Sequence, residues 1–170
     1  MDTLTVMDTA VSMSFADIAY VALGWMGLYG AAALAAIGSM IGCTIAGQSA
    51  CGALMEVESG YAKYTGLSAL PSSQSVYGLV IALTLKDILD QAGGMTEELT
   101  APFFVIGILS GVALMWAAIK QGECIAAAVK VSKSKPEVFG AAIIPAAVVE
   151  SFALFAFIVA YLASTSFVMG

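Results

Sequence analysis

Residues 144–162 read IPAAVVESFALFAFIVAYL and hold one carboxylate, Glu150, in an otherwise uncharged and strongly apolar run. The run is long enough to cross a bilayer, because a spanning helix needs about 20 apolar residues. A carboxylate near the bilayer centre costs about 2.5 to 3.5 kcal/mol if it faces lipid while ionised. The segment therefore predicts a transmembrane helix whose acid is neutralised, paired or functional.

The rest of the chain is almost as poor in charge. Of its 170 residues, 61% are apolar and 11% are charged, which excludes a water-soluble globular protein. There is no arginine or histidine, and the net charge is −6, so no basic patch is available to bind nucleic acid. Charge is absent from residues 18–55, 64–85 and 99–119, and from 138–170 apart from Glu150. These windows predict an all-α membrane protein with four transmembrane helices.

The lysine distribution predicts how these helices are oriented. The connections at residues 56–63 and 130–137 together carry four of the six lysines. Residues 1–17 carry three aspartates and no lysine, and they lack the basic segment of a cleaved signal peptide. Because cytoplasmic loops are enriched in lysine, we expect a multi-pass protein of the cell membrane with both hairpin tips in the cytoplasm and both termini outside. The chain then divides into an arm (1–17) and two hairpins (18–92 and 93–170).

The two hairpins look like copies of each other. Shifting the chain by 73 residues matches Gln48 with Gln121, and a shift of 74 in the later part matches Pro71 with Pro145. This comparison indicates an internal duplication with one extra residue in the second tip.

Small residues recur at four-residue spacing along the first predicted helix, and the third repeats the pattern more weakly. Membrane helices use such rows to bring their backbones close together. The pattern suits a ring with an inner and an outer layer of helices, and it also suits an ordinary four-helix bundle. The rows on the first helix contain Ala35, Ser39, Cys43, Gly47 and Cys51, and then Gly38, Gly42, Ala46 and Ala50.

Several polar side chains lie at nearly the same depth as Glu150. Counted from the hairpin tips, Ser73, Gln74, Gln121 and Glu150 are 13 to 16 residues away, or about 20 to 24 Å along their helices. A hydroxyl, two amide oxygens and a carboxylate form an all-oxygen set, which suits a hard cation such as Na⁺. The sequence therefore predicts a cation site shared by three helices.

Neighbouring residues extend this predicted site. Pro71 and Pro145 are expected to kink their helices and to free backbone carbonyls, so that an oxygen near Leu70 becomes a further ligand. Tyr77 lies on the same helical face as Ser73, where its hydroxyl could donate to Glu150. The alternative for Tyr77 is an aromatic residue that packs at the membrane interface.

Three segments carry a family resemblance that covers about residues 18–166. They are LPSSQSVYGLVIAL (70–83), QGECIAAAVKVSKSKPE (121–137) and AAVVESFALFAFIVAYL (146–162). The chain resembles the duplicated proteolipid, the K or c subunit, in the rotor ring of V-type and related V/A-type ATPases. The segment 70–83 is similar to the motif LPxTQxxYG of the sodium-translocating bacterial members.

The resemblance implies a set of Na⁺ ligands and a role for Glu150. Glu150 would be the ion-coupling carboxylate, and Ser73 stands where threonine is more usual, which should affect affinity more than ion identity. A proton carried by Glu150 is the alternative to Na⁺. The implied ligands are the Leu70 carbonyl, the Ser73 hydroxyl, the Gln74 and Gln121 side-chain oxygens and the Glu150 carboxylate.

The resemblance also implies partners. The chain would form a homo-oligomeric ring in lipid, facing a stator membrane subunit of the a/I type that supplies an arginine, with a central-stalk subunit at the cytoplasmic loops. The second helix has Ser75 or Val76 where the fourth has Glu150, so each copy would carry one ion, which favours pumping over ATP synthesis. The sequence contains no GxxxxGK[ST] loop, so the chain is not expected to be catalytic alone.

Other functions remain open at this stage. A secondary transporter with a duplicated core would use Glu150 to bind substrate, and a structural scaffold would not need this acid for transport. Glu123, which could pair with Lys120 three residues earlier on the third helix, is a second candidate for the ion-coupling carboxylate.

Overall fold

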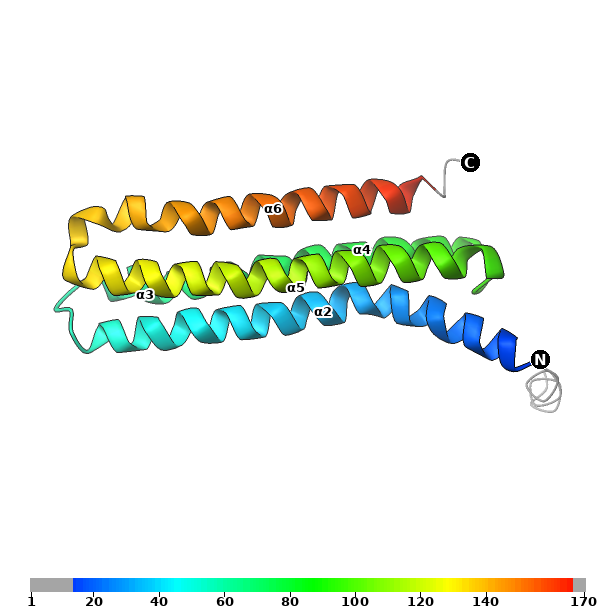
Figure 1. The fold of residues 1–170 in the computed structure, drawn as a ribbon, viewed down its shortest axis with the longest axis horizontal. Helices are drawn as coiled ribbons and strands as arrows, with labels where there is room; N and C mark the ends of the chain where they lie inside the picture. Colours follow the sequence, from blue (N-terminus) through cyan, green and yellow to red (C-terminus); the bar gives the residue numbers. More distant parts are fainter. Residues whose placement is uncertain (1–13, 167–170) are drawn as a thin grey trace.

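The structure, a computed structural model, describes residues 14–166, and its long segments are α-helices (Figure 1). Residues 1–13 of the predicted arm lie outside the described residues, as do 167–170. The helices are α2 (Phe15–Leu54), α3 (Tyr61–Leu67), the 3₁₀ turn η1 (Leu70–Ser72), α4 (Ser73–Gln91), α5 (Glu97–Ser134), the 3₁₀ turn η2 (Pro136–Val138) and α6 (Phe139–Thr165).

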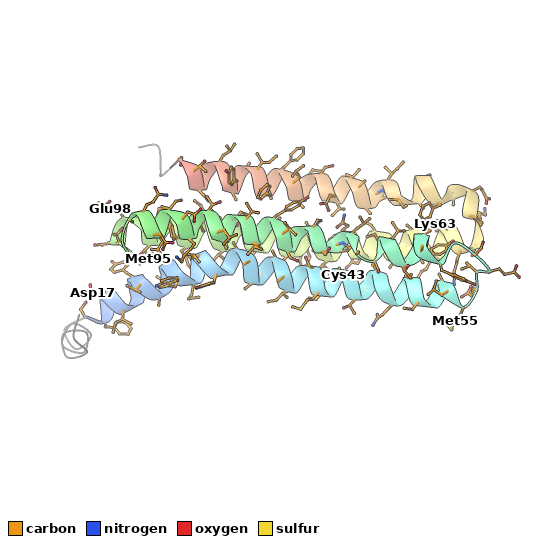
Figure 2. The ribbon with its side chains drawn as sticks, turned by 180° about the vertical axis from the view of Figure 1, so that it is seen from behind. Asp17, Cys43, Met55, Lys63, Met95 and Glu98 are labelled. Atoms are coloured by element: carbon orange, nitrogen blue, oxygen red, sulfur yellow. The ribbon has the colours of Figure 1, made fainter. Side chains whose placement is uncertain are left out.

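The helices form an elongated bundle in which the two hairpins lie side by side (Figure 1). The connections from α2 to α3 and from α5 to α6 lie at one end, and the connection from α4 to α5 lies at the other. Lys133 Nζ donates to Glu56 Oε1 at 2.6 Å, so the two hairpin tips are in contact. In Figure 2, Met55 and Lys63 mark the tip end, and Asp17 and Glu98 mark the opposite end.

Three segments among the described residues are long and apolar enough to cross a membrane: α2, α5 and Pro136–Thr165. The second predicted span is not a single helix, because window 64–85 is divided among α3, η1 and α4. Proline disfavours helical conformation in the residue before it and lacks an N–H donor, so α3 ends ahead of Pro71 and the chain tightens into a 3₁₀ turn.

The two prolines predicted to kink helices have different surroundings. Pro71 is buried in η1 between two helices, whereas Pro145 lies inside α6, which continues from Phe139 to Thr165. A break in the helix therefore accompanies Pro71 but not Pro145. This break places the start of α4 beside the middle of α6, which matters for the site described below.

Glycines allow α2 and α5 to pack backbone against backbone. A Cβ atom added to Gly107 would lie 1.8 Å from the carbonyl oxygen of Gly27. One added to Gly122 would lie 2.3 Å from the carbonyl oxygen of Gly42. Any side chain at these positions would collide with the facing helix, so the close approach predicted from the rows of small residues is confirmed.

Two clusters of buried apolar residues join the first hairpin to the second. Core cluster A lies between α2, α4, α5 and α6, and core cluster B lies nearer the hairpin tips. In cluster A, the first hairpin contributes Leu28, Ala31, Ala35, Ile81 and Leu85, and the second contributes Phe103, Leu114 and Ala153. In cluster B, the first hairpin contributes Ala46, Ala50, Ala53 and Tyr64, and the second contributes Ile125, Val129 and Ala146.

Candidate functional site

Glu150 on α6 accepts hydrogen bonds from four side chains. Ser73 Oγ and Tyr77 Oη each lie 2.8 Å from Oε1. The Nε2 atoms of Gln74 and Gln121 each lie 2.8 Å from Oε2. The donors come from α4 and α5, so three helices converge on one carboxylate, as their shared depth predicts.

The start of α4 sets the positions of three of these donors. Ser73, Gln74 and Tyr77 all occupy its first turns, directly after η1. The backbone N–H of Ser75 donates to Ser39 Oγ on α2 at 3.1 Å, which anchors this end of α4 to the neighbouring helix. The sequence placed Ser39 in a row of small residues but gave no sign of this hydrogen bond.

Tyr77 is held by a second contact, besides its hydrogen bond to Glu150. Its ring stacks on Phe157 of α6, with the ring centroids 5.1 Å apart and the planes 24° from parallel. Such stacking orients the Tyr77 hydroxyl toward Glu150. Phe157 was not predicted as part of the site, because a phenylalanine in an apolar run carries no sequence signal of its own.

The two glutamines form a buried network beside the carboxylate. Gln74 and Gln121 are 0% and 2% exposed. Gln74 Nε2 also donates to Gln121 Oε1 at 3.1 Å, and Gln121 Nε2 donates to the Ala146 carbonyl at 3.4 Å. Among the described residues, Gln74 Oε1 has no hydrogen-bond partner, and leaving a buried acceptor unpaired is costly. An acceptor of this kind next to a carboxylate suits a ligand that brings positive charge.

The backbone at Leu70 differs from the expectation. Its carbonyl accepts from the Ser73 N–H, so it is not left unpaired by Pro71. The 3₁₀ turn supplies this i to i+3 bond in place of the interrupted helical one. Ser73 Oγ also lies 3.1 Å from this carbonyl, but its one proton is donated over the shorter distance to Glu150. Leu70 still borders the site, because it lines a pocket of about 250 Å³ together with Ser73, Gln121 and Glu150.

Within residues 14–166, no basic side chain forms an ion pair with Glu150. The salt bridges in this part of the chain are Lys86 with Asp90, Lys120 with Glu123, and Lys133 with Glu56. An ionised carboxylate without a counter-charge is costly inside a bilayer. A bound cation, surrounded by carboxylate, hydroxyl and amide oxygens, would supply that counter-charge.

Glu123, the second candidate carboxylate, lies elsewhere. Its Oε2 is 2.9 Å from Lys120 Nζ, and the two side chains are 48% and 44% exposed. Lys120 Nζ also lies 5.3 Å from the centre of the Trp116 ring. The structure therefore groups Glu123 with Lys120 on an open face of α5 and not with the donors around Glu150.

The fold and this site define a membrane protein made of two related helical hairpins, with a carboxylate in the middle of the last helix. The family model for the C subunit of ATP synthase matches the chain twice, at residues 26–85 and 104–163. The chain belongs to this family, as a duplicated proteolipid.

Two curated relatives carry the same K designation. The chain is 34% identical over 136 residues to the A-type ATP synthase subunit K of Methanocaldococcus jannaschii, a match covering 78% of this chain and 58% of the relative. It is 29% identical over 131 residues to the V-type sodium ATPase subunit K of Enterococcus hirae, which covers 74% of this chain and 80% of the relative. The match thus spans little more than half the length of the archaeal relative.

The duplication is confirmed, but the register expected from the sequence is wrong. The matched ranges begin at residues 26 and 104 and end at 85 and 163, a displacement of 78 and not of 73 or 74. Gln48, expected to correspond to Gln121, is exposed, while Gln121 is buried. In the corrected register Glu150 corresponds to Ser72, again a residue without charge. Alanine and glycine are so frequent that several shifts produce matches, and a five-residue error turns a helix face by about 140°.

Contacts between the hairpins agree with the larger displacement. Ser49 Oγ donates to the Ala126 carbonyl, and Lys133 Nζ donates to Glu56; the partners in each pair are 77 residues apart. Corresponding residues of two hairpins that lie side by side are expected at nearly the same depth. A displacement near 78 satisfies this condition at both hydrogen bonds.

Proposed function

We propose that the chain is a rotor-ring subunit of a V-type ATPase and carries one Na⁺ per copy on Glu150. The observation that carries this proposal is a carboxylate in the middle of a membrane segment, surrounded by four donors and by one amide oxygen that is unpaired within the described part of the chain. The name of the Enterococcus relative, a sodium ATPase subunit, supports Na⁺ as the ion.

The proposed ligands are the oxygens that converge at the start of α4. Glu150 provides the charge, Ser73 a hydroxyl, and Gln74 and Gln121 amide oxygens. Of these, Gln74 Oε1 accepts no hydrogen bond from residues 14–166. The Leu70 carbonyl completes the set because it retains a second lone pair. Tyr77 is outside the set and orients the carboxylate through its hydroxyl.

Transport follows from the charge balance of this site. Na⁺ and Glu150 together are neutral, so an occupied site can move through lipid without the cost of an isolated charge. At the stator an arginine of the partner subunit would replace Na⁺ as the counter-charge and release the ion. Moving one ion against 100 mV costs about 2.3 kcal/mol, so ATP hydrolysis by other subunits can drive several ions.

The membrane arrangement follows the two hairpins. We propose that α3, η1 and α4 together form the remaining span, the second along the chain, because they run beside the three long apolar segments (Figure 1). Residues 18–92 and 93–170 are then the two hairpin units. Their tips would face the cytoplasm and the central stalk, and both termini would face outside.

Labelling of Glu150 by a carbodiimide is expected to slow when Na⁺ is added. The carboxyl oxygen adds to the central carbon of the carbodiimide and the acid proton passes to its nitrogen, so the reaction needs the protonated carboxyl group, and a bound cation displaces that proton. Mass spectrometry of the labelled peptide at constant pH and ionic strength, with K⁺ replacing Na⁺ as the control, measures the effect. Equal labelling at all Na⁺ concentrations and pH values would instead assign the site to protons.

Replacing Tyr77 by phenylalanine is expected to weaken Na⁺ binding without unfolding the site. The variant loses the hydrogen bond to Glu150 but keeps the ring that stacks on Phe157. A hydrogen bond to a charged group contributes about 1.5 to 3 kcal/mol, which corresponds to at least a tenfold higher half-saturating Na⁺ concentration. Na⁺-dependent protection from the carbodiimide measures it. Tyr161→Phe, on the same helix as Phe157 and distant from the hydrogen bonds of Glu150, is the control; equal effects of both changes would contradict the assignment.

A further inference from the structure

The helix that carries three of the four donors to Glu150, α4, does not cap its own start. The first four N–H groups of an α-helix have no partner inside the helix, and a serine at the N-cap position usually accepts from one of them. Ser72 holds that position, but its backbone is helical rather than extended, and within residues 14–166 its side chain caps no N–H of α4. Its Oγ instead donates to the Ala69 carbonyl at 2.6 Å. The 3₁₀ turn at Pro71 therefore leaves the start of α4 dependent on another element.

Ser39 of α2 supplies the acceptor that α4 lacks. The backbone N–H of Ser75, the third residue of α4, donates to Ser39 Oγ at 3.1 Å. An N-cap side chain normally binds the N–H of the second or third helical residue, so this bond has the position of a cap. Ser39 is 4% exposed, so water has little access to it. Ser39 thus caps α4 from a neighbouring helix.

Two close contacts lie on either side of this hydrogen bond. A Cβ atom added to Gly42 of α2 would lie 2.9 Å from Pro71 Cβ. One added to Gly78 of α4 would lie 2.5 Å from the Ala31 carbonyl oxygen of α2. These contacts set how closely α4 approaches α2, but apolar packing has no preferred direction. A hydrogen bond is directional, so Ser39 fixes the rotation of α4 about its own axis.

The rotation of α4 decides whether its donors reach the carboxylate. Ser73, Gln74 and Tyr77 each place a donor atom 2.8 Å from a carboxylate oxygen of Glu150. All three lie within two residues of Ser75, whose N–H is capped. A helix turns about 100° per residue, so side chains at these positions converge on one point only at one rotation. Because hydrogen bonds weaken steeply with distance and angle, a turned start of α4 loses several of them together.

The second hairpin has no such hydroxyl at the corresponding place. At the displacement of 78, Ser39 and Ser75 correspond to Ala117 and Ala153. There α6 is a continuous helix over Phe139–Thr165, so the N–H of Ala153 lies in the helix interior and needs no outside acceptor. The serine on the long helix thus accompanies the broken helix and is replaced by alanine beside the unbroken one.

We infer that Ser39 is a positioning residue of the ion site, which acts by capping α4 from α2. Ser39 lies outside the proposed ligand set, and α2 contributes no ligand to that set. Through this cap, α2 nevertheless controls the affinity for the ion. The inference rests on the proposed Na⁺ function and adds to it a residue that acts through the ligands on α4.

Replacing Ser39 by alanine in the whole complex tests this role. Na⁺-dependent protection of Glu150 from a carbodiimide gives the half-saturating Na⁺ concentration, which should rise about fivefold. That factor corresponds to about 1 kcal/mol, the typical cost of removing an N-cap side chain. A lower midpoint of thermal unfolding with an unchanged half-saturating Na⁺ concentration would show a merely structural role and overturn the inference.

Ser110→Ala is the matched control. Ser110 is also a buried serine on a long helix, at 6% exposed, but its hydroxyl donates to the Ile106 carbonyl of its own helix at 2.6 Å. Its half-saturating Na⁺ concentration should stay within about twofold of the unmodified complex, because a bond within one helix does not position another helix. An equal rise in both variants would contradict the assignment.

A second variant separates the hydrogen bond from the space that alanine leaves. Ser39→Cys keeps a side chain of similar shape but replaces the oxygen with sulfur, which is a weak acceptor. It should raise the half-saturating Na⁺ concentration as Ser39→Ala does. Normal Na⁺ binding in the cysteine variant would assign the alanine effect to an unfilled space and overturn the cap.

Hydrogen exchange at the start of α4 separates this inference from the proposed Na⁺ function. In Na⁺-free buffer, peptides that cover residues 73–77 should exchange at least about threefold faster in Ser39→Ala than in Ser110→Ala, because the capped N–H is released. Faster exchange in a complex that Na⁺ never protects would overturn the Na⁺ function and leave the positioning role, with a proton as the ion. Protection by Na⁺ in the unmodified complex, with neither exchange nor half-saturation changed by Ser39→Ala, would overturn the positioning role and leave the Na⁺ function standing.

Discussion

Replacing Glu150 by glutamine is expected to abolish ATP-driven Na⁺ uptake into vesicles that contain the whole complex. Without the carboxylate, a bound Na⁺ leaves a net positive charge in the bilayer, which costs about 2.5 to 3.5 kcal/mol or more. Since each 1.4 kcal/mol is a factor of ten, the affinity of the site for Na⁺ should fall by at least about 60-fold. The amide has nearly the same shape as the acid, so the ring should still assemble.

Glu123→Gln provides the matched control for this experiment. Glu123 is also a carboxylate inside a long apolar helix, and it pairs with Lys120 away from the site. Uptake by this variant should remain within about twofold of the unmodified complex, because an exposed ion pair contributes little. Retained uptake in the Glu150→Gln variant would reject an ion-carrying role for Glu150. Loss of uptake in the Glu123→Gln variant alone would move the site to Glu123.

Replacing Gly107 by alanine is expected to cause the largest loss of stability from a single methyl group. The new Cβ would lie 1.8 Å from the Gly27 carbonyl oxygen, and the facing atoms are backbone, which cannot turn aside. Overpacking typically costs 1 to 3 kcal/mol, and this contact between backbones should reach at least about 3 kcal/mol. The midpoint of thermal unfolding in detergent measures the effect.

Gly140→Ala is the control for the glycine experiment. Gly140 lies near the start of α6, is exposed, and has no atom within 4 Å of an added Cβ. Alanine there should leave the midpoint unchanged or raise it slightly, because glycine in a helix is less favourable than alanine by roughly 0.5 to 1 kcal/mol. Similar midpoints for the two variants would show that α2 and α5 do not approach as closely as the structure has them.

The candidate site was largely predictable because depth along a helix is a simple count. Ser73, Gln74, Gln121 and Glu150 were expected at one level, and the structure brings them within hydrogen-bonding distance. Tyr77 followed from its position one turn after Ser73. Phe157, which holds Tyr77, and Ser39, which holds the start of α4, were not predictable. An apolar or small residue gives the same sequence signal whichever way its side chain faces.

The second span and the repeat register were harder to predict. Absence of charge in window 64–85 indicates apolar surroundings, but it does not reveal that the chain tightens into a 3₁₀ turn at Pro71 and pairs the Leu70 carbonyl. Likewise, Gln48 was matched to Gln121 because both are glutamines, and amino-acid identity does not report which face of a helix a residue occupies. Their opposite burial shows that they occupy different faces.

Composition and residue order were sufficient for the membrane class, the duplicated hairpins and the acid in the last apolar run. These features depend on counts along one chain, such as the length of an uncharged run or the number of residues from a tip. The partners of Glu150 and the contact of Gly27 with Gly107 depend on how helices rotate and slide against each other. Rotation is set by side-chain packing between distant segments, so only the folded chain shows that this acid lies among four donors and that two glycines let α2 and α5 meet backbone to backbone.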